Sequence, residues 1–351
     1  MQKLSQIDFT KYWILIFSIL LLNLSQAQSD TFVVNKDTSI AIKYKKKSFL
    51  WPSDTFNKKR VHWVVTGMSS TVVLGYTGLY SLWYRGYPTA PFHFFNDIGE
   101  WNQIDKTGHV FGAYFETKFM HRIHNWAGIS DKKAIIWAGI GAFAIQSTIE
   151  VFDGFSAKWG ASFSDIGANA SGSMLYVGQE LAFHKQIVKM KYSFHGSEAS
   201  SDPNIIQRAD NLYGTSAPAR LLKDYNGVNA WFSVATSDIF KKQKKAKWFA
   251  IAIGYGAGGM YGGFENKWNV KINGVDSVLD YSSIQRYRRV LIAPDIDLEQ
   301  IHVKRPGWRM LLSMLNLLKF PSPAFEINTK GEIIFYPIYS FGLQYPLYFK
   351  K

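Results

Sequence analysis

The sequence contains no cysteine in 351 residues. Disulfide bonds, thiolate metal sites, a cysteine nucleophile and a lipid-modified cysteine are therefore excluded within it. Acidic residues are also scarce, since 26 Asp and Glu stand against 40 Lys and Arg, which gives a net charge of +14. No phosphate-binding loop, no Gly-x-Ser-x-Gly elbow and no His-Glu-x-x-His motif occurs. Because there is no cysteine to carry a lipid, any attachment to a membrane must come from the apolar surface of the protein.

The first 27 residues have the pattern of a secretory signal. Lys3 and Lys11 precede the apolar run YWILIFSILLLNL, and Ser25-Gln26-Ala27 follows it. A basic start, an apolar centre and small residues at the end are typical of a signal peptide that is cleaved on export. We therefore predict a signal over residues 1–27 and a mature protein in the periplasm or at the outer membrane. The alternative is an uncleaved segment that anchors the chain in the inner membrane.

Basic and aromatic residues are frequent and often adjacent. The basic residues gather at Lys43–Lys47, Asn57–Arg60 and Lys241–Lys247, and aromatic residues make up 16% of the chain. Trp and Tyr beside Lys or Arg suit a membrane interface. In an exported protein this favours anionic lipid head groups over nucleic acid, although solvated loops would carry the same charges. We expect a membrane or anionic lipid surface as partner, envelope proteins as a second class of partner, and no nucleic acid.

Helix-length apolar segments predict a bundle over residues 58–190. This stretch contains about four such segments. Gly67, Thr71 and Gly75 recur every four residues, which predicts close packing of the first helix against a neighbour. Ser162-Phe163-Ser164-Asp165 resembles a capping box and predicts the start of the last helix.

The rest of the chain has the pattern of strands. A polar, turn-rich linker over residues 191–218 is followed, over 219–351, by short runs of β-branched and aromatic residues and one amphipathic helix, GWRMLLSMLNLLKF. Asn273-Gly274 and Lys330-Gly331 are hairpin signals. The predicted fold class is therefore α+β, in which a polar lead-in over residues 28–57 and the helical bundle precede an antiparallel β-rich half.

Polar residues recur at the ends of the predicted helices. Asp105 and His109 are four residues apart and share a helix face, with Lys106 beside them. Asp165 and Asn169 have the same spacing in the last helix. The set is completed by Glu150 and Asp153 at the end of the third helix and by Gly172 in the last. Because buried carboxylates are costly unless paired, we expect these acids to converge on Lys106 and His109.

Two interpretations of this polar set remain open. A carboxylate-rich cluster with one His could hold a hard divalent cation or perform general acid–base chemistry. The candidate catalytic residues are then His109, Asp105, Glu150 and Asp165, and the candidate binding residues are Lys106, Asp153, Asn169 and Gly172. The alternative is a buried structural network, because acids in the first turn of a helix also complement the helix dipole. The sequence identifies no cofactor and no particular metal.

Two stretches resemble a known family. FHFFNDIGEWNQIDKTGHVFGAYF and QSTIEVFDGFSAKWGASFSDIGANASGS are similar to the YfiM-like family of uncharacterised, predicted periplasmic lipoproteins. The framework Asp-Lys-x-x-His, Glu and Ser-x-x-Asp-x-x-x-Asn-x-x-Gly resembles a distant form of the VanZ-like helical proteins. This resemblance implies an envelope protein of Gram-negative type and assigns the eight residues of the polar set, but it implies no reaction. The missing cysteine departs from the lipoprotein pattern.

These observations lead to one main functional hypothesis and two rivals. The main hypothesis is an exported, membrane-associated, non-enzymatic factor in envelope assembly or maintenance. The first rival is an envelope hydrolase or metal-dependent enzyme that acts on a lipid or cell-wall precursor at the polar set. The second is a carrier of a lipid or small molecule, with its cavity between the two halves.

Overall fold

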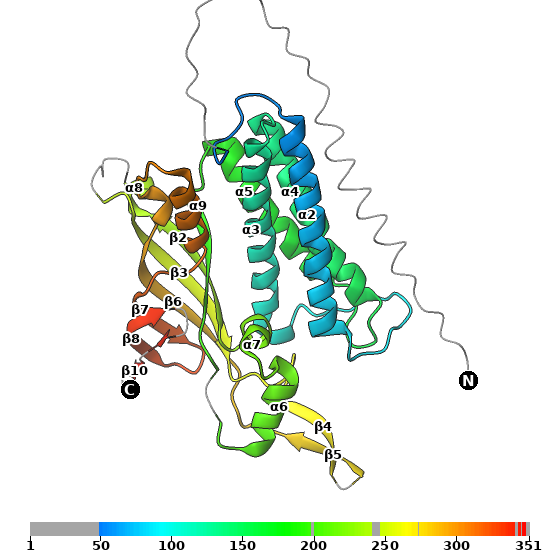
Figure 1. Cartoon of the computed structure of the whole chain (residues 1–351). Coiled ribbons are helices and arrows are strands. Elements are labelled where there is room, and N and C mark those ends of the chain that lie inside the picture. The colour runs from blue at the N-terminus through cyan, green and yellow to red at the C-terminus, as the bar shows by residue number, and fades with distance from the viewer. Residues whose placement is uncertain are drawn as a thin grey trace, which may run out of the picture.

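The computed structural model describes residues 49–197, 200–240, 246–272, 274–340, 343–344 and 346–348. The predicted signal peptide and most of the predicted lead-in lie outside these ranges. A helical half stands beside a half built around an antiparallel sheet (Figure 1). The predicted α+β class is therefore confirmed.

Long helices form the first half. They are α2 (Lys58–Leu79), which continues into a π-helical turn (Tyr80–Tyr84), α3 (Ile104–Trp126), α4 (Asp131–Gly154) and α5 (Phe163–Phe183). The Asn57 side chain caps α2 by accepting from the Arg60 N–H at 3.1 Å. Ser162 caps α5 by accepting from the Asp165 N–H at 3.1 Å, as the sequence predicts. Gly128, at φ +80°, lets the chain turn after α3.

Helices α3, α4 and α5 pack closely through small residues. A Cβ atom at Gly172 would lie 2.1 Å from the Val110 carbonyl oxygen, so α5 approaches the α3 backbone there. Gly139 on α4 makes room for Val177 of α5 in the same way. By length and composition, α4 is the one helix among the described residues that could cross a membrane. A core helix of a soluble protein can meet the same criteria, and α4 packs against both α3 and α5.

Helix α2 stands apart from this trio. Its buried side chains are Val64 and Tyr76, and the Tyr76 hydroxyl donates to the Ile145 carbonyl at 2.6 Å. The prediction that Gly67 and Gly75 pack closely against a neighbouring helix is wrong, because a Cβ atom at either would meet no other atom within 4 Å. These glycines instead line a mostly apolar groove of about 770 Å³ between α2, α3 and α4.

One large sheet forms the second half. Its order is β1-β2-β3-β6-β7-β8-β10, with β9 paired to β8, and neighbouring strands are antiparallel. The strands are β1 (Val188–Phe194), β2 (Val228–Ala235), β3 (Phe249–Gly258), β6 (Tyr287–Ile296), β7 (Ser322–Asn328), β8 (Ile333–Ser340), β9 (Leu343–Gln344) and β10 (Leu347–Tyr348). A separate hairpin, β4 (Lys267–Ile272) with β5 (Val275–Asp280), projects from it. Gly274 and Gly331 have positive φ at the two predicted hairpin turns.

Short helices fill the connections. They are α6 (Pro203–Tyr213), α7 (Ala217–Lys223), α8 (Thr236–Ile239), α9 (Pro306–Leu315) and a 3₁₀ turn at Leu298–Gln300. Helix α6 lies in the stretch for which the composition predicts turns. Asp202 caps it, Pro203 occupies its first turn, and Ile205 and Tyr213 are buried. Local capping and two apolar anchors therefore give a polar segment a helical structure.

The two faces of the sheet differ in polarity. The inward face combines an apolar core around Trp231 with buried charges, since Lys191 Nζ lies 2.7 Å from Asp295 Oδ2 and both side chains are fully buried. Beside them the buried Arg289 donates from Nε to Asn229 Oδ1 at 2.8 Å. The outward face carries large apolar side chains, because residues along a strand alternate between faces. The clearest set, called the outer row here, consists of Phe232, Ile253, Ile292 and Phe325, which lie opposite one another on β2, β3, β6 and β7.

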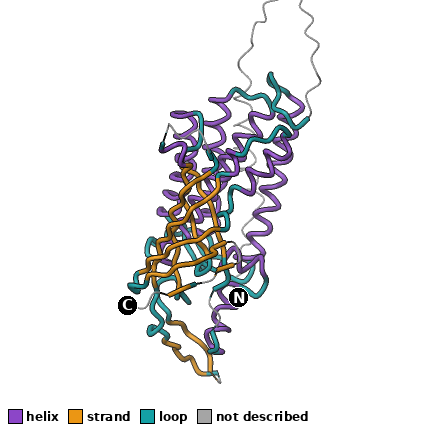
Figure 2. Tube along the Cα trace, turned by 90° about the vertical axis from the view of Figure 1, so that its left-hand side faces the viewer, coloured by secondary structure: helices purple, strands orange, loops and turns teal. Residues whose placement is uncertain are grey.

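The bundle half covers the outward face along β1 and at one end of β2 and β3, where Ile104 packs with Val228 and Ala257. Met190 of β1 packs with Tyr114 and Tyr176 of the bundle, and the Tyr192 ring lies 5.3 Å from the Phe111 ring. Beyond β1 the outer row is 44–53% exposed. Figure 2, viewed from the side of the sheet, shows the strands in front of the helices and the β4–β5 hairpin below them.

Candidate functional site

Six residues of the predicted polar set come together at one end of the bundle. Helix α3 begins there, α4 ends there and α5 begins there. The six are Asp105, Lys106 and His109 of α3, Glu150 of α4, and Asp165 and Asn169 of α5. We call these residues, with Asp97, the polar cluster. The N-termini of α3 and α5 favour acids at this end, because unpaired N–H groups give a helix start a partial positive charge.

Lys106 is the single cation at the centre of this cluster. Its Nζ lies 2.7 Å from Asp97 Oδ2, 2.8 Å from Asp105 Oδ2 and 2.9 Å from Asp165 Oδ1. Burial alone would lower the pKa of Lys106, but the surrounding carboxylates hold it above its usual range. Lys106 is therefore charged at any physiological pH and neutralises part of the acidic charge.

Asp97 is a member of the cluster that sequence reasoning missed. Ser162 Oγ and Ser164 Oγ donate to Asp97 Oδ1 at 2.5 and 2.7 Å. Burial acts to raise the pKa of Asp97, but hydrogen bonds from Asp165, Lys106 and the two serines hold it below its usual range. A signal was present, because Asp97 is the one acid of the aromatic connector that precedes the turn at Glu100.

His109 is neutral and has a defined orientation. Its Nδ1 lies 3.0 Å from Asn169 Oδ1, and because an amide oxygen only accepts, Nδ1 carries the proton in this arrangement. Burial, together with the charge of Lys106, lowers the pKa of His109 to about 4. The lone pair of Nε2 therefore faces Glu150 Oε1 at 3.8 Å and Asp165 Oδ1 at 3.7 Å.

The two carboxyl groups that face His109 hold protons unusually tightly. Burial, followed by the charge of Asp165, raises the pKa of Glu150 to about 9. Burial and the hydrogen bond with Asp97 raise the pKa of Asp165 to about 8. Glu150 Oε2 accepts from the Ser162 N–H at 2.9 Å, while Glu150 Oε1 has no hydrogen-bond partner. Strongly perturbed carboxyl groups beside an imidazole are typical of catalytic and metal sites.

A strained turn positions the start of α3. Trp101, Asn102 and Gln103 have φ values of 48°, 51° and 64°, so three consecutive non-glycine residues are left-handed. Such backbone is costly and persists only where the surroundings impose it. Here the sheet half supplies the contacts, because Trp101 N donates to Gly263 O at 2.7 Å and the Tyr255 hydroxyl donates to Asn102 O.

Exposed aromatic side chains lie on the segments that carry Asp97 and Asp165. Phe94 and Phe163 stack with ring centroids 4.4 Å apart, although they are 54% and 71% exposed. Ser162 and Ser164, which hold Asp97, flank Phe163 in the sequence. Phe95 and Ile98 of the same connector are also exposed. Exposed apolar side chains therefore adjoin Asp97, Ser162 and Ser164 in the chain.

Two predicted residues lie outside these contacts. Asp153 Oδ1 accepts from the Tyr84 hydroxyl at 2.9 Å, and burial raises the pKa of Asp153 to about 7. Gly172 serves close packing of α5 against α3 and presents no side chain to the cluster.

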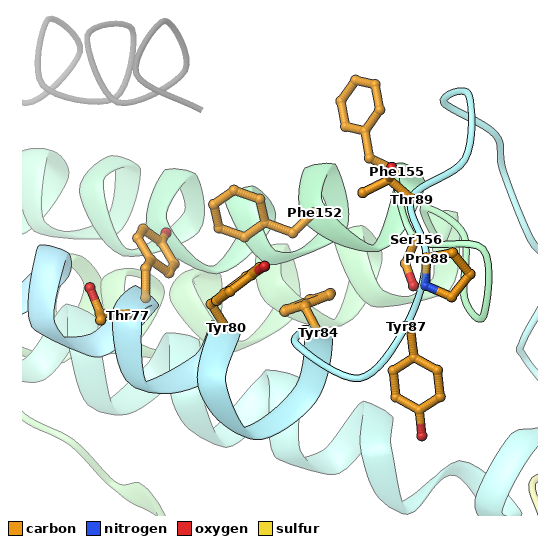
Figure 3. Close-up of a pocket in the computed structure, with 10 residues that line it drawn as sticks. Thr77, Tyr80, Tyr84, Tyr87, Pro88, Thr89, Phe152, Phe155 and Ser156 are labelled. Atoms are coloured by element: carbon orange, nitrogen blue, oxygen red, sulfur yellow. The ribbon is translucent and has the colours of Figure 1, made fainter. Parts of the chain in front are cut away.

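An aromatic pocket lies beside Asp153, between the ends of α2 and α4. It has a volume of about 420 Å³. Tyr80, Tyr84 and Phe152 form one part of its wall, and Phe155 and the Tyr87–Thr89 segment form another (Figure 3). The Tyr84 hydroxyl donates a hydrogen bond to Asp153, so the pocket wall contacts the end of α4 that also carries Glu150.

Comparison with known proteins supports the predicted location. Residues 94–178 match the model of a family described as predicted periplasmic lipoprotein (DUF2279), and this span contains every member of the polar cluster. No curated protein and no solved structure matches the chain. In this region the chain is similar to a family of predicted periplasmic lipoproteins, which agrees with an exported protein of the periplasm or outer membrane.

Proposed function

We propose that this is an exported, membrane-associated envelope protein with a non-enzymatic role in assembly or maintenance of the envelope. One observation carries the proposal: the large sheet buries charged side chains on its inner face and exposes a row of large apolar side chains on its outer face. The finer likeness to YfiM-like and VanZ-like proteins belongs to the same proposal.

The outer row is too apolar to be left in water without a cost. Its four side chains lie directly opposite one another and are half exposed. Val290, Ile327 and Ile333 extend the apolar face on β6, β7 and β8, and are 46–59% exposed. Full burial of one such side chain contributes about 1.5–3 kcal/mol. Contiguous apolar surface of this kind marks a contact with a protein or a membrane.

The charges around this face favour a lipid surface. Lys247 and Trp248, directly before β3, are exposed. At the other end of the strands, Arg288 and Lys330 are exposed. Apolar side chains between basic and aromatic residues suit hydrocarbon flanked by anionic head groups. The net charge of +14 acts in the same direction.

Vesicle flotation of the exported, purified protein tests this proposal. We expect the protein to float with phosphatidylglycerol vesicles. The triple variant Ile253→Ser/Ile292→Ser/Phe325→Ser should bind these vesicles with an affinity at least about tenfold lower. The side chains are already half exposed, so the variant should keep its fold, which circular dichroism checks. The matched control is Val275→Ser/Val278→Ser on the β4–β5 hairpin, where both side chains are similarly exposed.

Two results would contradict a lipid-facing sheet. One is a wild-type protein that stays in the aqueous fraction with anionic and neutral vesicles alike. The other is a triple variant that floats as well as the wild type. A stable lipid-free dimer that the triple variant disrupts would assign the face to a second copy of the chain instead.

A hydrolase is the second candidate, and the geometry of His109 favours it. Its Nε2 lone pair, which can act as a base or a ligand, faces two protonated carboxyl groups, which can act as proton donors. The exposed rings of Phe94 and Phe163 suit a lipid or a lipid-linked cell-wall precursor as substrate class.

Single variants separate an enzyme from a structural network. If the cluster is catalytic, His109→Ala, Asp105→Asn and Asp165→Asn should each abolish product release from such lipids, followed by mass spectrometry, while the melting temperature changes little. If it is structural, each should lose a few kcal/mol of unfolding free energy. A wild-type protein that releases no product from either lipid class would rule out this candidate.

A further inference from the structure

We propose that His109, Glu150 and Asp165 bind one divalent transition-metal ion, with Zn²⁺ or Mn²⁺ as the fitting class. One imidazole nitrogen and two carboxylate oxygens form a donor set that such ions accept. The inference does not rest on the membrane role of the sheet. It deepens the second candidate function, because a bound ion would supply the Lewis acid of a metal-dependent hydrolase.

The three donor atoms are placed for a shared ion rather than for bonds to one another. His109 Nε2 lies 3.8 Å from Glu150 Oε1 and 3.7 Å from Asp165 Oδ1, and ligand atoms of all three residues fall within 4.8 Å of one another. These separations are too long for hydrogen bonds. They are short enough for one ion to approach each atom at about 2.0–2.2 Å after small side-chain movements.

Glu150 provides the independent sign of a missing ligand. Its side chain is 2% exposed, and its Oε1 atom points toward His109 without any hydrogen-bond partner. A buried carboxylate oxygen without a partner is costly and calls for an explanation. An ion at this position would satisfy it, while Oε2 keeps its bond from the Ser162 N–H.

The surroundings hold the ligands as metal sites usually do. Asn169 is fully buried, and its Oδ1 accepts from His109 Nδ1–H, which aims Nε2 at the two carboxyl groups. A second hydrogen bond of this type is the normal support for a metal-bound histidine. Asn169 is therefore a positioning residue for the proposed ion.

Carboxyl groups outnumber cations in the polar cluster. Around Lys106 and His109 stand the carboxyl groups of Asp97, Asp105, Glu150 and Asp165, and Lys106 is the cation that contacts them. A second acidic trio, Asp97, Asp105 and Asp165, has donor atoms at similar spacing. Its centre is taken by Lys106 Nζ, within 2.9 Å of each carboxylate. The ion is therefore expected on the His109 side.

Calorimetry on chelator-treated protein, with Zn²⁺ and Mn²⁺ as probes, tests the site. We expect one ion per chain, and at least a 100-fold loss of affinity in Glu150→Gln and in His109→Gln. Asn169→Ala should lose about 10- to 100-fold, as for other residues that orient a ligand. Glu116→Gln is the matched control, because it removes another buried carboxyl group of α3 and should leave affinity unchanged. His121→Gln controls for the separate His121–Asp131 pair, whose atoms lie 3.0 Å apart.

A measurement on the wild type guards against variants that fail to fold. Pulsed electron paramagnetic resonance of the Mn²⁺-loaded protein should detect one coordinated imidazole nitrogen. Absence of that nitrogen signal, binding equal in Glu150→Gln and wild type, or no binding of either ion would each overturn the proposal. Metal binding without any hydrolysis would reject the second candidate function and leave the metal site standing.

Discussion

Glu116 shows how one buried carboxyl group makes stability depend on pH. It lies on α3 facing the α2 groove, and its Oε1 accepts from Gln146 Nε2 at 2.7 Å. Burial raises the pKa of Glu116 to about 8, and the hydrogen bond from Gln146 only partly offsets this. In the unfolded chain the group titrates near pH 4.3. Between these values the folded state binds more protons, so its stability falls as pH rises from about 5 to 8.

The variant Glu116→Gln should remove this dependence. A neutral amide keeps the contact with Gln146 and carries no charge to bury, so we expect a gain in unfolding free energy at pH 8 on the order of 2 kcal/mol. At pH 4 the gain should vanish, because the glutamate is then protonated in both states. Urea denaturation at the two pH values measures this, with the exposed Asp276→Asn as control. An equal gain at both pH values would refute the assigned cause.

At the residue scale, sequence spacing placed polar residues on a common helix face but did not identify their partners. Asp105 and His109 share a face of α3 through their four-residue spacing, yet His109 contacts Asn169 of α5. Asp97 could not be placed in this way, because its connector has no periodic pattern that reports which way a side chain points. Whether the assembled residues catalyse a reaction stays a prediction.

At the element scale, the close approach of α5 to α3 at Gly172 gives a sharp test. A Cβ atom there would meet the Val110 carbonyl oxygen at 2.1 Å, which the backbone cannot relieve without moving a helix. We expect Gly172→Ala to lower the unfolding free energy by about 2–4 kcal/mol. Thermal or urea denaturation, followed by circular dichroism, measures the change.

Gly167→Ala is the matched control on the same helix. A Cβ atom at Gly167 meets nothing within 4 Å, so the change should be neutral or stabilise by up to about 1 kcal/mol through helix propensity. If the two alanine variants had equal stabilities, close packing at Gly172 would not explain its glycine.

The elements differed in how far the sequence could predict them. Caps are local chemistry, so Ser162 marked the start of α5 correctly. Small residues at four-residue spacing mark a face that can pack closely but not that it does, and on α2 the Gly67–Gly75 face lines a groove instead. Alternation along β3 and β6 predicts two faces, but only the assembled sheet decides which face is outward.

At the scale of the whole molecule, the two halves pack together through two apolar groups. Ile104, at the start of α3, packs in one apolar group with Val228, Ala257 and Met260 of the sheet half. Met190 of β1 in turn packs between Tyr114 and Tyr176 of the bundle. The sequence separates these partners by more than 100 residues in the first group, so no local pattern could have paired them.

The left-handed turn at Trp101–Gln103 makes the carboxylate geometry a property of the entire chain. The turn joins Asp97 to Asp105, yet its backbone and side chains are fastened to Gly263, Tyr255 and Arg288, far downstream in the sequence. A fragment that ends after α5 would thus retain every acidic group of the polar cluster and lose the contacts that hold this turn. A movement of the sheet at Tyr255 or Arg288 would shift the turn, and the carboxyl groups on either side of it would move with it.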